Sequence, residues 1–169
     1  SDLGTGRGLV YWDGGNGDRR LVLSNGPYLY ELNAANGQLI RTFGEEGRVH
    51  LGKDLDVDGQ PNLSLNTPGT VYKDLLIIGS NPGEGANSPP GHIRAYDLRT
   101  GARRWIFHTV PFPGEFGYET FPPEYYKSAS AANNWAGMAL DEARGIVYVP
   151  TGSPGGDFWA AGRGGAGPF

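Results

Sequence analysis

One strand–turn phrase occurs twice in this chain, and it restricts the possible folds more than any single residue does. The first copy spans residues 28–37 and the second spans residues 92–101. In both copies an alternating stretch runs into Asn or Asp, two residues intervene, and Asn-Gly or Thr-Gly closes a tight turn before another extended stretch. A repeated unit of this kind indicates an array of similar β modules.

The composition agrees with many short strands joined by turns. Among 169 residues there are 29 glycines and 13 prolines without a collagen period, which favours an all-β protein over disorder or long helices. The net charge of −4 comes without a basic run, so we expect no nucleic-acid partner. The absence of cysteine excludes disulfides and thiolate metal sites. The longest aliphatic run, residues 75–78, is too short for a transmembrane segment.

The predicted strands fall into two sets of four and a third set that is incomplete. The sets cover residues 9–43, residues 69–108 and, incompletely, residues 135–169. In the first set we expect the fourth strand at residues 38–43. A four-stranded antiparallel meander is one blade of a β-propeller, so the predicted fold class is all-β, with about two and a half propeller blades.

The two copies begin at residues 28 and 92, farther apart than the roughly 40–50 residues of a minimal blade, and the chain contains two recognisable insertions. They are residues 48–64 and residues 111–134. Long loops on a rigid β scaffold commonly carry binding residues. Because so few blades cannot close a ring, we interpret the chain as a piece of a larger propeller or as an assembling subunit. A small open β domain is the alternative.

Common catalytic motifs are absent from the sequence, which has no dinucleotide-binding glycine motif, no P-loop and no nucleophile elbow. His50, His92 and His108 lack metal-ligand spacing and are interpreted as surface or strand histidines. Three segments remain as candidate strand ends that would converge on one mouth of a propeller. They are residues 77–85, 132–137 and 149–159.

In these segments and in residues 95–105, the chain resembles the pyrroloquinoline-quinone-dependent dehydrogenases, an eight-bladed quinoprotein family. Residues 95–105 match the family's tryptophan-docking repeat, in which the Trp, here Trp105, packs between adjacent blades. The first copy departs from it, with Arg41 in place of the Trp and Phe43 two residues later.

The resemblance extends from Arg7 to Asp157, with several segments matching in order. Residues 28–33, leading to residues 41–47, look closer to the branch that resembles membrane-bound glucose dehydrogenase. The methanol-type enzymes have a Cys-Cys pair, and its absence from this chain agrees with that branch.

The resemblance implies that pyrroloquinoline quinone (PQQ) is the cofactor. Trp135 falls where the family places the indole beneath the quinone rings, and a flat tricyclic acid needs such an apolar face. Asn66 and Thr67 fall where the family hydrogen-bonds the carboxylates of the quinone, and Asn81 is a further candidate for the same role. A Trp that fills a blade core, and a turn before a strand at Asn66 and Thr67, stay open as alternatives.

A calcium or magnesium ion beside the quinone is also implied. Glu84 matches the family's metal-ligating glutamate, and a solvated loop carboxylate is the alternative. Ser153 stands where alcohol-oxidising relatives have a ligating Asn, and its hydroxyl is the weaker ligand. Asp157 is a candidate for contact with cofactor or substrate, although its surroundings do not match the family's catalytic Asp. That base lies in a His-Asp-x-Trp-Asp-like segment absent here, so we expect this chain alone to be inactive.

The implied reaction is oxidation of an alcohol or aldose, with hydride passing to the quinone, a metal as Lewis acid and a carboxylate as base. This implies a small-molecule alcohol or sugar substrate, further blades or chains that close the ring, and a bacterial periplasmic location. Two other readings stay open. One is a non-enzymatic propeller scaffold for protein interactions. The other is a carbohydrate-binding module in which sugars stack on Trp12, Trp159 and the cluster Tyr118, Tyr125 and Tyr126.

Overall fold

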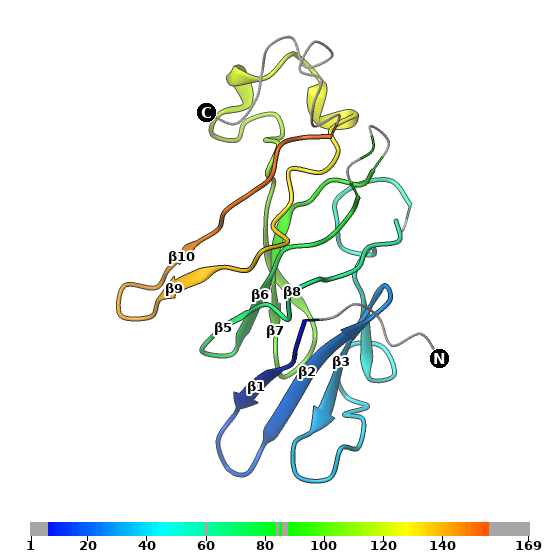
Figure 1. The fold of residues 1–169 in the computed structure, drawn as a ribbon, viewed down its shortest axis with the longest axis vertical. Coiled ribbons are helices and arrows are strands. Elements are labelled where there is room, and N and C mark those ends of the chain that lie inside the picture. The colour runs from blue at the N-terminus through cyan, green and yellow to red at the C-terminus, as the bar shows by residue number, and fades with distance from the viewer. Residues whose placement is uncertain (1–6, 60, 84, 86–87, 156–169) are drawn as a thin grey trace.

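The computed structural model describes residues 7–59, 61–83, 85 and 88–155, and its regular elements are mainly short β-strands (Figure 1). Two four-stranded antiparallel sheets have the strand orders β1-β2-β3-β4 and β5-β6-β7-β8, and a hairpin, β9–β10, forms a third sheet. The elements are β1 (Val10–Asp13), β2 (Arg19–Asn25), β3 (Tyr28–Asn33), β4 (Arg48–His50), β5 (Thr70–Tyr72), β6 (Leu75–Ile78), β7 (Ile93–Asp97), β8 (Arg103–Phe107), the 3₁₀ helices η1 (Tyr118–Thr120) and η2 (Tyr125–Lys127), β9 (Ala139–Asp141) and β10 (Ile146–Tyr148). The prediction of an all-β chain built from four-stranded meanders is confirmed.

The two copies of the repeated phrase form the same turn. In each, the glycine N–H donates to the carbonyl of the Asn or Asp four residues earlier, from Gly37 to Asn33 and from Gly101 to Asp97, both at 2.8 Å. The Asn33 and Asp97 side chains each accept a further backbone N–H from two residues ahead at 2.9 Å. Both glycines have a left-handed backbone, with φ of +70° and +78°, so the turn needs them.

The prediction of a fourth strand at residues 38–43 is wrong. The fourth strand of the first sheet is β4, which pairs with β3 through Leu29 opposite Val49, and residues 38–43 contribute only a single bridge, at Leu39. Around this bridge, Asn33 N–H donates to the Gln38 carbonyl and Ile40 N–H donates to the Glu31 carbonyl, both at 2.8 Å. Phe43 lies beyond this short pairing and is fully buried. Left-handed residues at 44, 46 and 47 turn the chain back before β4 begins. One predicted insertion, residues 48–64, therefore contains a strand.

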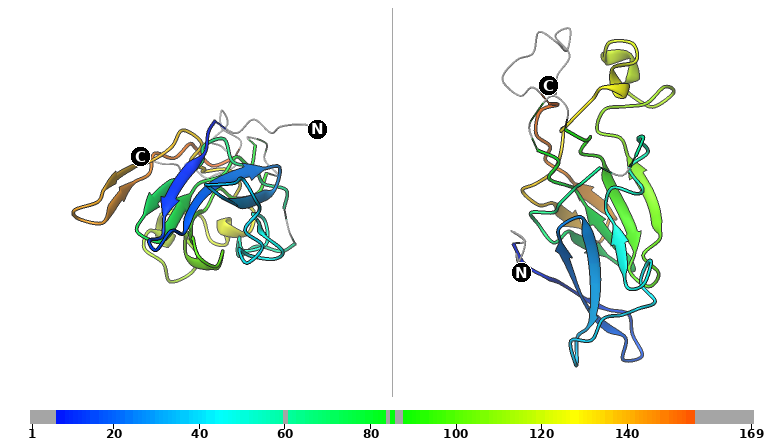
Figure 2. Two further views of the ribbon diagram at one scale, coloured as in Figure 1. Left: turned by 90° about the horizontal axis from the view of Figure 1, so that it is seen from below. Right: turned by 90° about the vertical axis from the view of Figure 1, so that its right-hand side faces the viewer.

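The first and second sheets pack face to face and enclose the main core (Figure 2). Side chains alternate along each strand, so β6 sends Leu76 and Ile78 toward the first sheet while Ile77 points the other way. The main cluster comprises Trp12, Val22, Leu29, Phe43, Val49, Leu51, Leu55, Leu63, Leu65, Leu76, Ile78, Tyr96 and Leu98. On its opposite face the second sheet forms a smaller cluster with residues of the third. The second sheet is thus the middle layer.

A buried arginine closes the seam between the first two sheets. Arg20 on β2 donates two hydrogen bonds of 2.8 Å to the Asp18 carboxylate and one of 2.7 Å to Glu31. It also donates to the main-chain carbonyls of Leu98 at 2.9 Å and Arg99 at 3.2 Å in the second sheet's turn. The hydrogen bonds from Arg20 lower the pKa of Asp18. Burial raises the pKa of Glu31 from 4.5 to about 7, and the ion pair with Arg20 offsets only part of that cost.

We expect Glu31 to make the protein less stable as the pH rises. Its folded-state pKa of about 7 lies above the ordinary 4.5, so its contribution is fully present below pH 4.5 and is lost as the pH rises to 7. The loss amounts to roughly 3 kcal/mol at most. In the Glu31→Gln variant, the free energy of unfolding, measured by urea denaturation from pH 4.5 to 8, should lack this decline.

Glu142→Gln, on the exposed β9–β10 turn, is the matched control for loss of one carboxyl group. If wild type and Glu31→Gln keep a constant difference in unfolding free energy over the whole pH range, then the raised pKa of Glu31 is refuted.

Candidate functional site

The three candidate segments come together where β6 and β10 end, as the sequence predicts (Figure 1). Ser80 N–H, two residues beyond β6, donates to the Asn134 carbonyl at 3.1 Å. Gly152 N–H, beyond β10, donates to the Asn133 carbonyl at 2.9 Å, and Ala132 N–H donates to the Ser153 carbonyl at 3.0 Å. Residues 132–134 therefore lie between the other two segments and bind both.

Two buried amide side chains tie this junction together. Asn133 Nδ2 donates to the Ser80 carbonyl at 2.9 Å, and Asn134 Nδ2 donates to the carbonyls of Gly137 and Pro150 at 2.8 and 2.7 Å. We call Asn133 and Asn134 with these partners the amide knot. The sequence analysis marked the segment but not these two side chains, although adjacent asparagines between predicted strands are a signal for such bonding.

The amide knot requires close approach of two backbones. A Cβ atom on Gly79 would lie 2.2 Å from the Asn134 carbonyl oxygen, and one on Gly91 would lie 2.2 Å from Asn133 Cβ. Neither glycine has a left-handed φ, so the requirement is for space. The sequence therefore uses glycine here because only hydrogen fits between the segments.

Trp135 follows the amide knot directly and is 47% exposed. It does not belong to the buried clusters of the described chain. The Arg7 guanidinium lies 5.9 Å from the centroid of the indole. Arg7, which the sequence analysis did not single out, thus places a positive charge next to an aromatic surface that a flat ligand can stack on.

The predicted polar residues are linked to Arg7 and to the segment around Trp135. Arg7 N–H donates to the Asn66 carbonyl at 3.0 Å, and the Asn66 side-chain oxygen accepts from Asn81 Nδ2 at 3.1 Å. The methyl group of Thr67 would lie 4.0 Å from a Cβ built on Gly137, two residues after Trp135. The structure therefore joins Asn66 and Asn81 to each other and to Arg7, and it places Thr67 near Gly137.

The predicted metal ligands are described only in part. Ser153 lies in the junction, bound through its carbonyl to Ala132, whereas Glu84 lies outside the described residues. Asp157, the candidate for contact with cofactor or substrate, also lies outside them. Within residues 7–59, 61–83, 85 and 88–155, no group of three or more His, Asp or Glu side chains could hold a metal ion. Two buried polar atoms of the junction, Ser80 Oγ and Asn134 Oδ1, have no hydrogen-bond partner in the described chain, which suits a polar ligand or water nearby.

Two of the three histidines, His92 and His108, lie in contact with each other. The rings of His92 and His108 meet edge to face at 4.6 Å, and His108 stacks on Phe112 at 3.9 Å. His108 also contacts Glu115 at 2.7 Å and Asp56 at 3.4 Å. Burial lowers the pKa of His92 to about 3, so this ring is neutral. The cluster fastens the start of the 111–134 insertion, whose end carries the amide knot.

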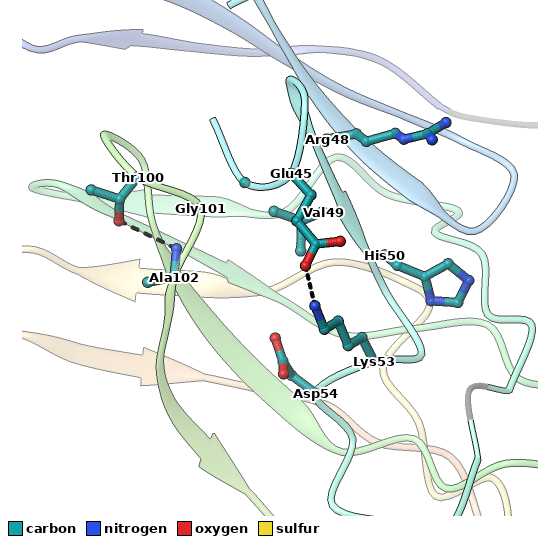
Figure 3. A pocket seen from close by; sticks show the side chains of 10 residues that line it. Glu45, Arg48, Val49, His50, Lys53, Asp54, Thr100, Gly101 and Ala102 are labelled. Atoms are coloured by element: carbon teal, nitrogen blue, oxygen red, sulfur yellow. Dashed lines mark hydrogen bonds and ion pairs between the residues drawn. The ribbon is translucent and has the colours of Figure 1, made fainter. Parts of the chain in front are cut away.

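A separate pocket of about 160 Å³ lies between the loops around β4 and the β7–β8 turn (Figure 3). Glu45 and Lys53 form an ion pair at its edge, and Arg48, His50 and Thr100 also line it. It contains none of the residues that the sequence analysis assigned to cofactor or metal, so the junction at Trp135 remains the candidate site.

Comparison with known families identifies the chain. The sequence profile described as "PQQ: Glucose/ethanol/alcohol dehydrogenase, beta-propeller domain" matches residues 2–169. The chain belongs to this family. The prediction of a PQQ-dependent quinoprotein propeller is confirmed.

Individual relatives agree with the family. The chain is 33% identical over 138 residues to quinate/shikimate dehydrogenase (quinone) of Acinetobacter baylyi, covering 80% of this chain and 17% of the relative. It is 33% identical over 135 residues to the glycerol dehydrogenase large subunit of Gluconobacter oxydans, covering 79% and 18%. It is 31% identical over 150 residues to quinoprotein glucose dehydrogenase of Escherichia coli, covering 86% and 18%. This quinoprotein chain thus spans less than a fifth of each relative's length.

A solved structure shows the same fold. The quinohemoprotein alcohol dehydrogenase of Comamonas testosteroni superposes with a TM-score of 0.68 at 24% identity, covering 88% of this chain and 22% of that chain.

In the part of the chain that the structure describes, no helix is long and apolar enough to cross a membrane.

We expect Gly79→Ala to destabilise the protein because its Cβ would meet a backbone oxygen that cannot move without breaking the amide knot. The free energy of unfolding should fall by roughly 2 kcal/mol or more. Gly152→Ala is the matched control in the same junction, since its Cβ would meet Asn133 at an ordinary 3.8 Å. Equal thermal stabilities of the two variants would contradict the close approach.

Proposed function

We propose that this chain forms part of the PQQ site of a quinoprotein dehydrogenase that oxidises an alcohol or aldose. The observation that carries the proposal is the half-exposed Trp135 indole, which directly follows the buried amide knot. The full reaction belongs to the longer protein, because this chain spans 17–18% of its relatives. In this proposal the residues of this chain bind the cofactor and orient it.

The residues around Trp135 fit a flat polycarboxylic acid. The indole offers an apolar face, Arg7 places a positive charge over the ring at 5.9 Å from its centroid, and the Asn66 and Asn81 side chains offer amide groups. The amide knot holds Trp135 through main-chain and side-chain bonds on both sides of the segment. A rigid floor of this kind fixes the plane of a bound ring system and excludes water from one face.

PQQ, when bound, supplies a quinone that accepts hydride from the substrate. In this proposal Trp135 sets the ring plane, Arg7 neutralises a carboxylate, and Asn66, Thr67 and Asn81 orient the polar edge. The catalytic base comes from another part of the longer protein. The relatives named for quinate/shikimate, glycerol and glucose support a substrate with several hydroxyl groups.

The proposal includes a divalent cation, calcium or magnesium, beside the cofactor. Glu84 is its expected carboxylate ligand, with Ser153 as a weaker candidate. Hard cations prefer such oxygen donors. We further propose that the longer protein acts in the bacterial periplasm, which fractionation of cells that express it would test.

We expect Trp135→Ala to weaken PQQ binding by roughly tenfold to a hundredfold in the full-length protein, because the stacking surface is lost. Trp135→Phe should lose less, since a smaller ring remains. The measurement is the dissociation constant for PQQ from fluorescence titration of the apoprotein. Phe116→Ala, a fully exposed aromatic elsewhere, is the control. A wild-type protein that binds no PQQ would favour the propeller scaffold and overturn the proposal.

We expect Glu84→Gln to raise the calcium concentration needed for half-maximal reconstitution with PQQ by roughly tenfold or more, because a neutral amide is a weaker ligand. Glu142→Gln on an exposed turn serves as the control. An unchanged calcium requirement would remove Glu84 from the metal site while leaving the role of Trp135 intact.

A further inference from the structure

Both insertions of this chain contact one imidazole, that of His108, and both lead to the candidate site. The first insertion, residues 48–64, is followed by Asn66 at the polar edge of that site. The second insertion, residues 111–134, ends in the amide knot and is followed by Trp135. One insertion therefore supports the polar edge of the site, and the other supports its floor.

The end of the first insertion is bonded into the site. The Ser64 carbonyl accepts Asn81 N–H at 2.8 Å, and Asn81 Nδ2 donates to the Asn66 side chain at 3.1 Å. Farther back in the insertion, Leu55 and Leu63 are fully buried in the main core. The stretch between these two leucines is therefore anchored at both ends, and contacts along it decide how firmly it is held.

The His108 ring, which directly follows β8, lies between two carboxylates, one from each insertion. Its Nδ1 is 2.7 Å from Glu115 Oε1, and its Nε2 is 3.4 Å from Asp56 Oδ2. Only 9% of the side chain is exposed, and Phe112 stacks on the ring at 3.9 Å. The ring therefore bridges the two insertions at a place that water reaches poorly.

Each of the two carboxylates has a second partner that keeps it in place. Glu115 Oε2 accepts Phe112 N–H at 2.7 Å, and Asp56 Oδ1 accepts from Arg103 at 2.7 Å. Burial opposes ionisation of Glu115, but the hydrogen bonds from Phe112 and His108 hold its pKa below the ordinary value. Asp56 has a left-handed backbone with φ of +57°, which is costly for a residue other than glycine. Contacts of its carboxylate favour this conformation.

The other titratable ring beside His108 is neutral. His92, immediately before β7, meets it edge to face at 4.6 Å, and burial lowers the pKa of His92 to about 3. Arg103 on β8 is directed at Asp56 and at the Asp54 carbonyl. The titratable and charged groups around the His108 ring are thus Asp56, Glu115, His92 and Arg103.

Only a charged imidazole can donate to both carboxylates. With both nitrogens protonated, Nδ1 donates to Glu115 and Nε2 faces Asp56 with a hydrogen. A neutral ring has a single N–H, which belongs at the shorter contact with Glu115, so a lone pair of Nε2 then faces the Asp56 carboxylate. Nε2 is the weaker side in the structure as well, since it is buried and forms no hydrogen bond in the described chain. Loss of the proton therefore weakens the hold on the first insertion.

We propose that His108 is a positioning residue whose charge clamps the first insertion to the second and so sets the spacing between Asn66 and Trp135. In the charged state, both His108 and Arg103 hold Asp56. In the neutral state Arg103 holds it alone, and the stretch between the buried leucines loosens without leaving the core. Where it concerns PQQ, this positioning role rests on the proposed function, whereas the clamp itself depends only on the two insertions.

Hydrogen exchange of the full-length protein without cofactor tests the clamp. Imidazole groups change charge between about pH 5 and about pH 8. Protection factors, in which the intrinsic effect of pH on exchange is divided out, are compared in peptides from residues 48–64. Between these two pH values they should fall at least roughly fivefold more in wild type than in Asp56→Asn. The Asn amide can donate to the lone pair of a neutral ring, so its contact does not need the proton.

The matched control is Asp58→Asn, an exposed carboxylate two residues away, which should behave as wild type does. All three proteins keep Glu31, so its effect on the whole fold cancels in the comparison. Equal changes of protection in wild type and Asp56→Asn would overturn the clamp.

His108→Gln decides the question if Asp56→Asn fails to fold. This side chain cannot become charged, so at about pH 5 its protection in residues 48–64 should be at least roughly fivefold below that of wild type. Protection equal to that of wild type at this pH would also overturn the clamp.

The dissociation constant for PQQ is the second readout. Between the two pH values it should rise at least roughly fivefold more in wild type and Asp58→Asn than in Asp56→Asn. An equal rise in all three proteins would overturn the positioning role. A wild-type protein that binds no PQQ at either pH would overturn the proposed function and the positioning of the cofactor with it, whereas the clamp is decided by hydrogen exchange alone.

Discussion

The packing of the first sheet against the second is the constraint on which the rest of the structure depends. It buries one face of β6 and β7, and Arg20 closes it by donating across the seam to the carbonyls of Leu98 and Arg99. The guanidinium is buried, but it is stabilised because two carboxylates and two carbonyls accept its hydrogen bonds. This packing fixes the position of the end of β6. It thereby fixes the main chain at Ser80, which bonds to Asn133 and Asn134.

The candidate site is held by neutral groups. Asn133 and Asn134 connect three segments through amide hydrogen bonds and bring no charge into the junction. Arg7 lies over the Trp135 ring and brings a positive charge. This positive charge suits an anionic ligand. The His92, His108 and Phe112 cluster fastens the other end of the insertion that leads into the knot. An insertion fixed at both ends holds Trp135 at a rigid position rather than on a free loop.

Much of the fold was predictable because it depends on local rules. The Asx turns at Asn33 and Asp97, with glycine at the left-handed position, follow from residue type alone. The fourth strand of the first sheet was misplaced because Phe43 has the apolar spacing of a strand residue but is buried without pairing. The three converging segments were predicted correctly, while Arg7 and the two knot asparagines were missed because their partners are distant in sequence.

The sequence by itself determined the repeating unit, the all-β class, the family resemblance and the segments that meet at Trp135, because turn chemistry and alternation are encoded over a few residues. Only the tertiary structure decided which residues of each copy are buried. Val49 and Phe107 hold equivalent places in two sheets, yet one is buried and the other exposed. The physical reason is that burial depends on the neighbouring sheet, and no local pattern records whether that neighbour is present. The same holds for Trp135, whose indole is 47% exposed while the segment before it packs through its backbone and its asparagines.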